Sequence, residues 1–190
     1  MKYDTARVII TLDCPGSCWY CCNKQEGALD RAREIPTLDE IFDCVDYENV
    51  VITGGEPLGC IDRTFDVLHG LSDLRKEGRF GTFKLYLYTA IYDSDIDSLL
   101  PYLDGITYGL HAPEVGGDLS VADLNDFLAM QWLAFNKPSL SWRLWINAAL
   151  NQVVPLIPSA WDRIVVANPQ VPTCPVPDNE DLYILADDFK

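Results

Sequence analysis

The feature that most constrains this chain is the alternation of short apolar runs with longer segments of helical spacing. Runs rich in β-branched and aromatic residues occur at 7–12, 50–53, 83–89, 105–110, 142–149 and 163–167. Strands that alternate with helices form parallel sheets, because each helix returns the chain to the start of the next strand. Six such strands are too few for a closed eight-stranded barrel. The sequence therefore predicts an α/β fold with a partial, laterally open (β/α)6 barrel.

Local signals predict where several helices begin and end. Residues 37–40, Thr-Leu-Asp-Glu, have the pattern of a capping box and predict a helix over about 37–45. Gly78 is expected to end a helix that starts near Ile61, and Pro101 is expected to end a short helix over 94–100. Ser120 is expected to cap a longer helix that carries Leu124, Phe127, Leu128 and Leu133. The charged segment 23–36 is expected to be exposed and irregular.

The length of 190 residues predicts one domain over 1–190, with a core from 7 to 167. Beyond that core the chain contains four prolines between 168 and 178. Proline cannot donate to a sheet ladder, so residues 168–190 are expected to form a wrapping tail with one edge strand at 182–185.

Charge and cysteine content bound the environment and the partners. The net charge is −15, with 29 acidic and 14 basic residues, and no Lys/Arg cluster is visible. Direct binding of duplex nucleic acid is therefore not expected. No apolar run approaches the ~20 residues of a membrane span, and the N-terminus lacks a signal-peptide pattern, so a cytoplasmic location is expected. Seven cysteines, three of them close together, favour metal binding in a reducing compartment over disulfides.

Three cysteines follow the first predicted strand, in the segment Cys14-Pro-Gly-Ser-Cys18-Trp-Tyr-Cys21. Three thiolates from one loop can hold three irons of a cubane cluster and leave the fourth iron open. The same spacing is compatible with zinc, with Cys22 or Cys44 as a fourth ligand. The triplet alone therefore predicts a metal site of either kind.

A second motif, Gly54-Gly-Glu-Pro57, follows the next strand. Parallel α/β sheets bind their ligands at the carboxyl ends of the strands. Adjacent glycines allow backbone to approach a ligand closely, Glu56 offers an acceptor for an ammonium group, and Pro57 stiffens the turn. A zinc site needs none of these, so the second motif favours a cluster that binds a small-molecule ligand.

Together the two motifs resemble those of the radical S-adenosylmethionine (SAM) superfamily, over most of the chain from Arg7 to about Ala167. The resemblance implies a 4Fe-4S cluster held by Cys14, Cys18 and Cys21, with SAM chelating the fourth iron. It implies further cofactor contacts from Tyr20 to the adenine region, and from the loop of Gly54, Gly55, Glu56 and Pro57 to the methionyl amino group.

The activity implied by the resemblance is reductive cleavage of SAM to a 5′-deoxyadenosyl radical, which abstracts hydrogen from a substrate. The cofactors supply this chemistry, and the protein orients them and excludes water and oxygen. An oxygen-sensitive enzyme of this kind is expected to need an external electron donor, such as a flavodoxin- or ferredoxin-like protein. The substrate, a small molecule, nucleoside or peptide, is not identified.

Several further residues are weaker candidates. Thr89 ends the third strand and is a candidate SAM contact or a structural strand end. His111 ends the fourth strand as a candidate substrate or SAM contact, although a lone histidine there is more often structural. Arg143 and Asn147 are expected to alternate toward the barrel interior, and Asn147, Asn151 or Gln152 is a candidate SAM contact. Cys60 is a candidate hydrogen donor, or a small buried residue.

Within the superfamily the sequence is similar to small members that include activases of glycyl-radical enzymes and 7-carboxy-7-deazaguanine synthases. Those subfamilies tend to carry Asp-hydrophobic-Lys after the fourth strand, whereas this chain reads Gly109-Leu-His-Ala112, which leaves the substrate open. Three hypotheses follow: a radical SAM enzyme with a small-molecule, nucleoside or peptide substrate, an activase of a partner protein, and a non-catalytic metal-binding or electron-transfer protein.

Overall fold

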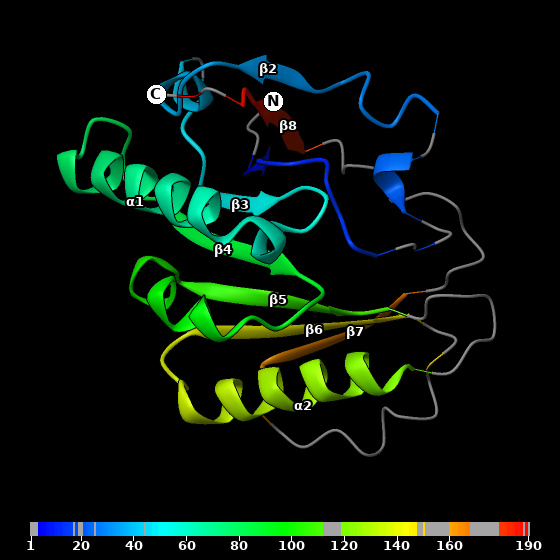
Figure 1. The fold of residues 1–190 in the computed structure, drawn as a ribbon. Helices are drawn as coiled ribbons and strands as arrows, with labels where there is room; N and C mark the ends of the chain where they lie inside the picture. Colours follow the sequence, from blue (N-terminus) through cyan, green and yellow to red (C-terminus); the bar gives the residue numbers. More distant parts are fainter. Residues whose placement is uncertain are drawn as a thin grey trace.

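One sheet of eight parallel strands organises the fold (Figure 1). The structure is a computed structural model that describes residues 4–16, 18, 21–24, 26–43, 45–111, 119–147, 150, 160–167, 179–187 and 189. The sheet order is β2-β8-β1-β3-β4-β5-β6-β7. Its strands are β1 (Thr5–Ile9), β2 (Arg33–Ile35), β3 (Asn49–Thr53), β4 (Lys84–Thr89), β5 (Gly105–Leu110), β6 (Ser141–Asn147), β7 (Arg163–Ala167) and β8 (Glu180–Leu185). The predicted parallel α/β architecture is confirmed, but the count of six strands was wrong.

The two extra strands, β8 and β2, extend the sheet beyond β1. The expected edge strand at 182–185 is longer than predicted and lies between β1 and β2, not at an edge. It pairs in register with a strand on each side, and its residues Leu182, Tyr183 and Leu185 are buried, as expected for an internal strand. Strand β2 falls in the segment expected to be irregular. Its three residues include two exposed charged ones, so it has too little hydrophobic pattern to be predicted.

Two long helices lie on the same side of the sheet (Figure 1). Helix α1 (Ile61–Glu77) ends at Gly78 with a left-handed φ of 71°, and α2 (Val121–Asn136) begins with a capping box between Ser120 and Asp123. Both ends were predicted. The helix expected over 37–45 is only a 3-10 turn, η2 (Asp39–Phe42). The segment 94–100 is η4 (Ser94–Ser98) followed by η5 (Leu100–Tyr102), with Pro101 inside the second turn.

The strands bury one face and expose the other to a cavity. Alternate residues such as Val8, Ile52 and Leu87 are fully buried on the helix-covered face. Their neighbours, among them Arg7, Val51 and Arg143 from three different strands, line the cavity on the opposite face, as the period of two in a strand requires. The inward orientation predicted for Arg143 is confirmed.

Helix α2 keeps an apolar outer face. Its residues Phe127 and Leu133 pack into the core, but Leu124 and Leu128, which the spacing placed with them, are 44% and 50% exposed. They continue an exposed stripe at helical spacing with Val121, Trp132 and Phe135. In the described part of the chain, no helix is both long and apolar enough to cross a membrane.

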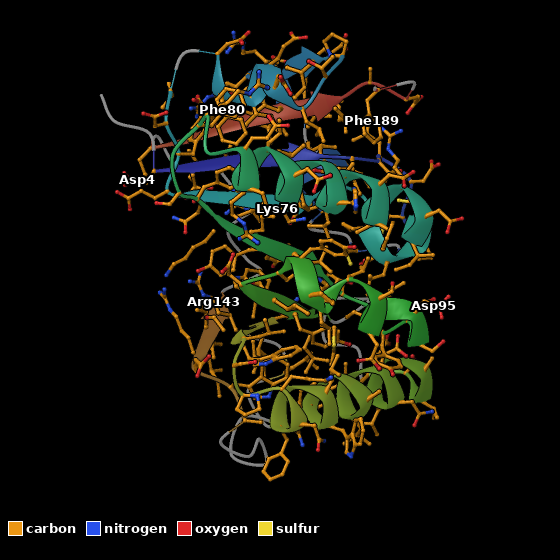
Figure 2. All side chains as sticks on the ribbon, turned by 90° about the vertical axis from the view of Figure 1, so that its left-hand side faces the viewer. Asp4, Lys76, Phe80, Asp95, Arg143 and Phe189 are labelled. Carbon is orange, nitrogen blue, oxygen red and sulfur yellow. The ribbon has the colours of Figure 1, made fainter. Side chains whose placement is uncertain are left out.

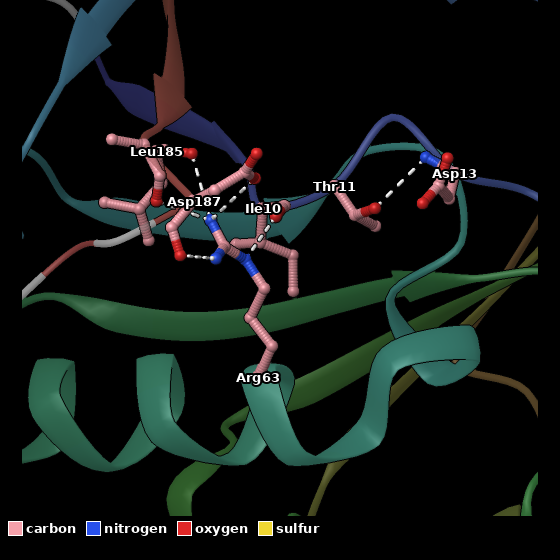
Figure 3. Close-up of polar contacts among 7 residues, drawn as sticks. Ile10, Thr11, Asp13, Arg63, Leu185 and Asp187 are labelled. Carbon is pink, nitrogen blue, oxygen red and sulfur yellow. Dashed lines mark hydrogen bonds and ion pairs between the residues drawn. The ribbon is translucent and has the colours of Figure 1, made fainter.

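Arg63 ties α1 to the ends of two strands (Figure 3). Its guanidinium donates hydrogen bonds to the carbonyl oxygens of Ile10, Leu185, Ala186 and Asp187, at the carboxyl ends of β1 and β8. These carbonyls lie at or just past the ends of the two strands, so without Arg63 they would need other hydrogen-bond donors. One side chain therefore fixes the chain just before the cysteine loop.

Replacing Arg63 by Met is expected to lower the free energy of unfolding by about 2–4 kcal/mol, because several charge-assisted hydrogen bonds are lost together. Urea unfolding monitored by circular dichroism measures the change. The control is Arg79→Met, since Arg79 is 55% exposed and its ion pair with Asp39 should contribute less than about 1 kcal/mol. Equal losses in the two variants would contradict the role given to Arg63.

Candidate functional site

The cysteine loop leaves the carboxyl end of β1 and carries three cysteine thiols. Cys14 is exposed, and Cys18 and Cys21 are half-buried. The Cys21 N–H donates to the Cys18 carbonyl (3.2 Å), and the Lys24 N–H donates to the Cys21 carbonyl (3.1 Å). The last bond belongs to the 3-10 turn η1 (Cys22–Lys24). The third cysteine is thus held by a hydrogen-bonded turn.

Gly16 brings the first two sulfurs of the loop near one point. A Cβ on Gly16 would lie 3.3 Å from the Cys14 Sγ and 3.8 Å from the Cys18 Sγ. The Gly16 N–H also donates to the Cys14 Sγ at 3.3 Å. Hydrogen bonds to cluster sulfurs stabilise their negative charge and tune the reduction potential. The space beside Gly16 is therefore a cradle between two thiols that a side chain would fill.

The three thiols of the loop are compatible with the ligand set of a cubane cluster. Cys14, Cys18 and Cys21 all line one cavity of about 550 Å³. Among the described residues, no three Cys, His, Asp or Glu side chains are gathered closely enough to hold one metal ion. In a cubane cluster each thiolate binds a different iron, so its ligands need not meet at one point. The side chains of Cys22 and Cys44, considered above as zinc ligands, lie outside the described residues, as does Cys174.

The glycines of the second motif bring the ends of β1 and β3 into backbone contact. The Gly55 N–H donates to the Thr11 carbonyl (2.6 Å) and the Glu56 N–H to the Asp13 carbonyl (2.9 Å). A Cβ on Gly54 would lie 2.3 Å from the Thr11 oxygen, and one on Gly55 only 2.0 Å from the Asp13 oxygen. Gly54 also has a φ of 146°. Both glycines line the cavity, and they join the second motif to the loop that carries the cysteines.

Asn23 makes a further link that the sequence did not reveal. Its side-chain Nδ2 donates to the Gly54 carbonyl at 2.7 Å. Asn23 also lines the cavity, two residues after the last cysteine of the motif. An asparagine in a polar segment gives no signal of such a contact, because the partner is 31 residues away. The cysteine loop is thus held to the Gly-Gly-Glu-Pro loop from both of its ends.

Glu56 is a buried carboxylate with three donors. It is only 3% exposed. Its Oε1 accepts from the Leu58 N–H (3.0 Å) and the Thr89 hydroxyl (2.6 Å), and its Oε2 accepts from the Ala90 N–H (2.8 Å). Burial raises the pKa of Glu56, against the lowering effect of these hydrogen bonds. A carboxylate has about four acceptor positions, so capacity remains for a cationic donor at the cavity.

Thr89 and Pro57 position this carboxylate. Thr89 is 1% exposed at the end of β4, and its hydroxyl bonds Glu56, which it thereby orients. Pro57 begins the turn η3 (Pro57–Cys60), and its carbonyl accepts from the Thr64 hydroxyl at 2.6 Å. The sequence predicted Thr89 to be either a SAM contact or a structural strand end. In the structure its described partners are Glu56 and the backbone of Ile91.

His111 lies over a glycine at the end of β5. A Cβ on Gly109 would lie 2.6 Å from the His111 Nε2, so the imidazole folds back over that position. Its ring centroid is 5.9 Å from that of Trp145, and both residues line the cavity. Burial lowers the pKa of His111 to about 4, although Asp123 acts in the opposite direction. The imidazole is therefore neutral near pH 7.

Acid is expected to destabilise the protein through His111. The ordinary pKa of histidine is 6.5, and the pKa of His111 in the native protein is about 4. Between pH 6.5 and pH 4, the imidazole therefore takes up a proton in the unfolded chain but not in the native chain. Stability is thus unaffected above pH 6.5 and falls as the pH drops toward 4. His111→Gln should remove this loss, which amounts to roughly 3 kcal/mol between pH 7 and pH 4. Urea unfolding of both proteins at several pH values tests this, and parallel profiles would contradict it.

The cavity gathers most, but not all, of the predicted site residues. Those that line it are Cys14, Cys18, Cys21, Gly54, Gly55, Glu56, Thr89 and His111. Asn147 is buried (1% exposed) and is not among the described lining residues. Cys60 lines a separate cavity of about 270 Å³ that shares Cys14, Pro15 and Glu56 with the first, and burial raises the pKa of its thiol. Tyr20, Asn151 and Gln152 lie outside the described residues.

Comparisons with known proteins add no assignment. No protein-family model matches the sequence, and a search of curated proteins finds no significant match.

Proposed function

We propose that this chain is a radical SAM enzyme. The observation that carries the proposal is the junction of two loops at the carboxyl ends of neighbouring strands. The loop with Cys14, Cys18 and Cys21 and the loop with Gly54, Gly55 and Glu56 share backbone hydrogen bonds and face one cavity. A cluster with an open iron needs an adjacent site for the molecule that completes it, and this junction supplies one.

When bound, a reduced 4Fe-4S cluster and SAM would supply a 5′-deoxyadenosyl radical that abstracts hydrogen from the substrate. The three thiolates would hold the cluster, with the Gly16 N–H supporting the charge on Cys14. Glu56 would accept the methionyl ammonium, and its three existing donors fix its direction. The exposed Cys14 places one edge of the site near solvent, where an external flavodoxin- or ferredoxin-like donor can deliver electrons.

The fold supports the same proposal. We interpret the open sheet as a partial barrel whose lateral opening lies between the edge strands β2 and β7. A concave sheet of this kind surrounds the substrate on one side only and admits it from the other. The walls of the cavity would then limit the access of water to a radical formed inside it.

Anaerobic reconstitution tests the proposal. The purified chain is loaded with iron and sulfide, reduced with dithionite, and incubated with SAM. The expected products are 5′-deoxyadenosine and methionine in equal amounts, formed only after reduction. A fully loaded and reduced cluster that leaves SAM intact would overturn the proposal. The iron content and the absorption spectrum of the reconstituted protein identify a failure to load the cluster.

A further inference from the structure

Two arginines face the cavity, and among the described residues no carboxylate pairs with either of them. Arg143 of β6 and Arg163 of β7 both line the cavity and are paired in register on neighbouring strands. The Arg143 guanidinium lies 4.9 Å from the centroid of the Tyr86 ring, and Arg163 is exposed. Neither forms an ion pair within the described part of the chain.

This pair is unusual in a chain with 29 acidic and 14 basic residues. Elsewhere arginines meet carboxylates: Arg7 pairs with Glu180, and Arg75 lies 2.7 Å from Asp104. Neighbouring strands are only about 4.8 Å apart, and like charges at paired positions repel each other. The pairing of Arg143 with Arg163 is thus electrostatically unfavourable until an anion binds to the two side chains.

The pair lies away from the thiols. Cys14 and Glu56 follow the carboxyl ends of their strands, whereas Arg163 is the first residue of β7. Arg143 precedes the end of β6 by four residues, or about 13 Å at the usual rise of a strand. Figure 2, which looks along the sheet, shows Arg143 on the side opposite Asp95 and the helices. The carboxylate of Glu180, which also lines the cavity, is already paired with Arg7.

We infer that Arg143 and Arg163 bind an oxyanion, a phosphate or a carboxylate, carried by the substrate. The inference rests on the proposed function, because it assigns substrate binding to the end of the same cavity that lies away from the thiols. A guanidinium presents a planar fork of N–H donors that matches two oxygens of such a group. Contact with Tyr86 holds the Arg143 fork in place before the ligand arrives. The substrate is then an extended anion that spans roughly 10 Å or more between its charged end and the carboxyl ends of the strands.

Anion binding by the reconstituted protein tests the assignment. The probes are glycerol phosphate and glutarate, with glycerol as the neutral control, and binding is followed by calorimetry. The variant Arg143→Gln/Arg163→Gln should bind the preferred anion about ten-fold more weakly or worse. The control Lys76→Gln/Arg79→Gln removes equal charge from exposed positions of the helix layer and should change binding less than about two-fold.

The outcomes separate this inference from the proposed function. Tighter binding of glycerol phosphate assigns a phosphorylated substrate, and tighter binding of glutarate assigns a carboxylate. Failure of both probes to bind at low ionic strength, or equal binding by the double variant, overturns the inference. The exposed Arg163→Gln single variant keeps the test decisive if the double variant does not fold. Anion binding is measured without SAM, so absence of SAM cleavage by the reduced wild-type protein would count against the proposed function alone.

Discussion

Cys18→Ala is expected to abolish reconstitution of the cluster. The variant keeps only two thiolates, and the space beside Gly16 loses one of its two sulfurs. Two thiolates cannot hold a cubane cluster whose fourth iron must stay open. We expect the iron content and the visible absorption of the variant to fall to background, and 5′-deoxyadenosine formation to become undetectable. Iron and sulfide analysis after anaerobic reconstitution measures the first effect, and chromatography of the nucleosides the second.

Cys60→Ala is the matched control for this experiment. Cys60 is also a half-buried free cysteine close to Glu56, but it lines the smaller cavity and donates only to the Pro57 carbonyl. The control should therefore retain a full cluster. Retention of a full cluster by Cys18→Ala would show that the ligands have been chosen wrongly.

Gly55→Ala should disrupt the junction between the two loops. The added methyl group would lie 2.0 Å from the Asp13 oxygen and 2.7 Å from the Leu12 carbonyl carbon, so backbone rather than a flexible side chain would have to move. The move would break the Gly55-to-Thr11 and Glu56-to-Asp13 hydrogen bonds. We expect the free energy of unfolding to fall by about 3 kcal/mol or more. Calorimetry should then show a melting temperature lower by roughly 6–12 °C.

Gly59→Ala provides the comparison, four residues further along the chain. A Cβ there would make only ordinary contacts of 3.9 Å with Glu56 and Pro15. Its stability should change by less than about 1 kcal/mol. Similar melting temperatures for the two variants would mean that the loops can separate freely, which would remove the main support for a shared site.

Much of the fold could be predicted because its signals are local. The strand β5 and β7 boundaries match the predicted runs, and Gly78 and Ser120 mark helix ends through their own backbone and side-chain chemistry. The position of β8 could not be predicted, because a strand's place in the order of a sheet depends on partners far away in sequence. The apolar outer stripe of α2 was likewise hidden, since spacing alone does not say which of two apolar faces is buried.

The candidate site could likewise be predicted only in part. The motif spacing indicated Cys14, Cys18, Cys21 and the Gly-Gly-Glu-Pro loop, and the structure places them around one cavity. The sequence could not show that the Thr89 hydroxyl would donate a hydrogen bond to Glu56, or that the Asn23 side chain would donate one to the Gly54 carbonyl. Those contacts depend on the distance between loops, which only the folded sheet defines. The pairing of Arg143 with Arg163 is likewise a matter of strand register.

The placement of β8 also affects the order in which the molecule can form during synthesis. Arg7 of β1 and Glu180 of β8 are 173 positions apart, whereas β1 and β3 are separated by fewer than 50. Contacts between distant segments form late, because the intervening chain must first be made and closed. A nascent chain can therefore join its cysteine loop to the Gly-Gly-Glu-Pro loop early, while the other edge of β1 stays open. The two loops would then be in place before the sheet around them is complete.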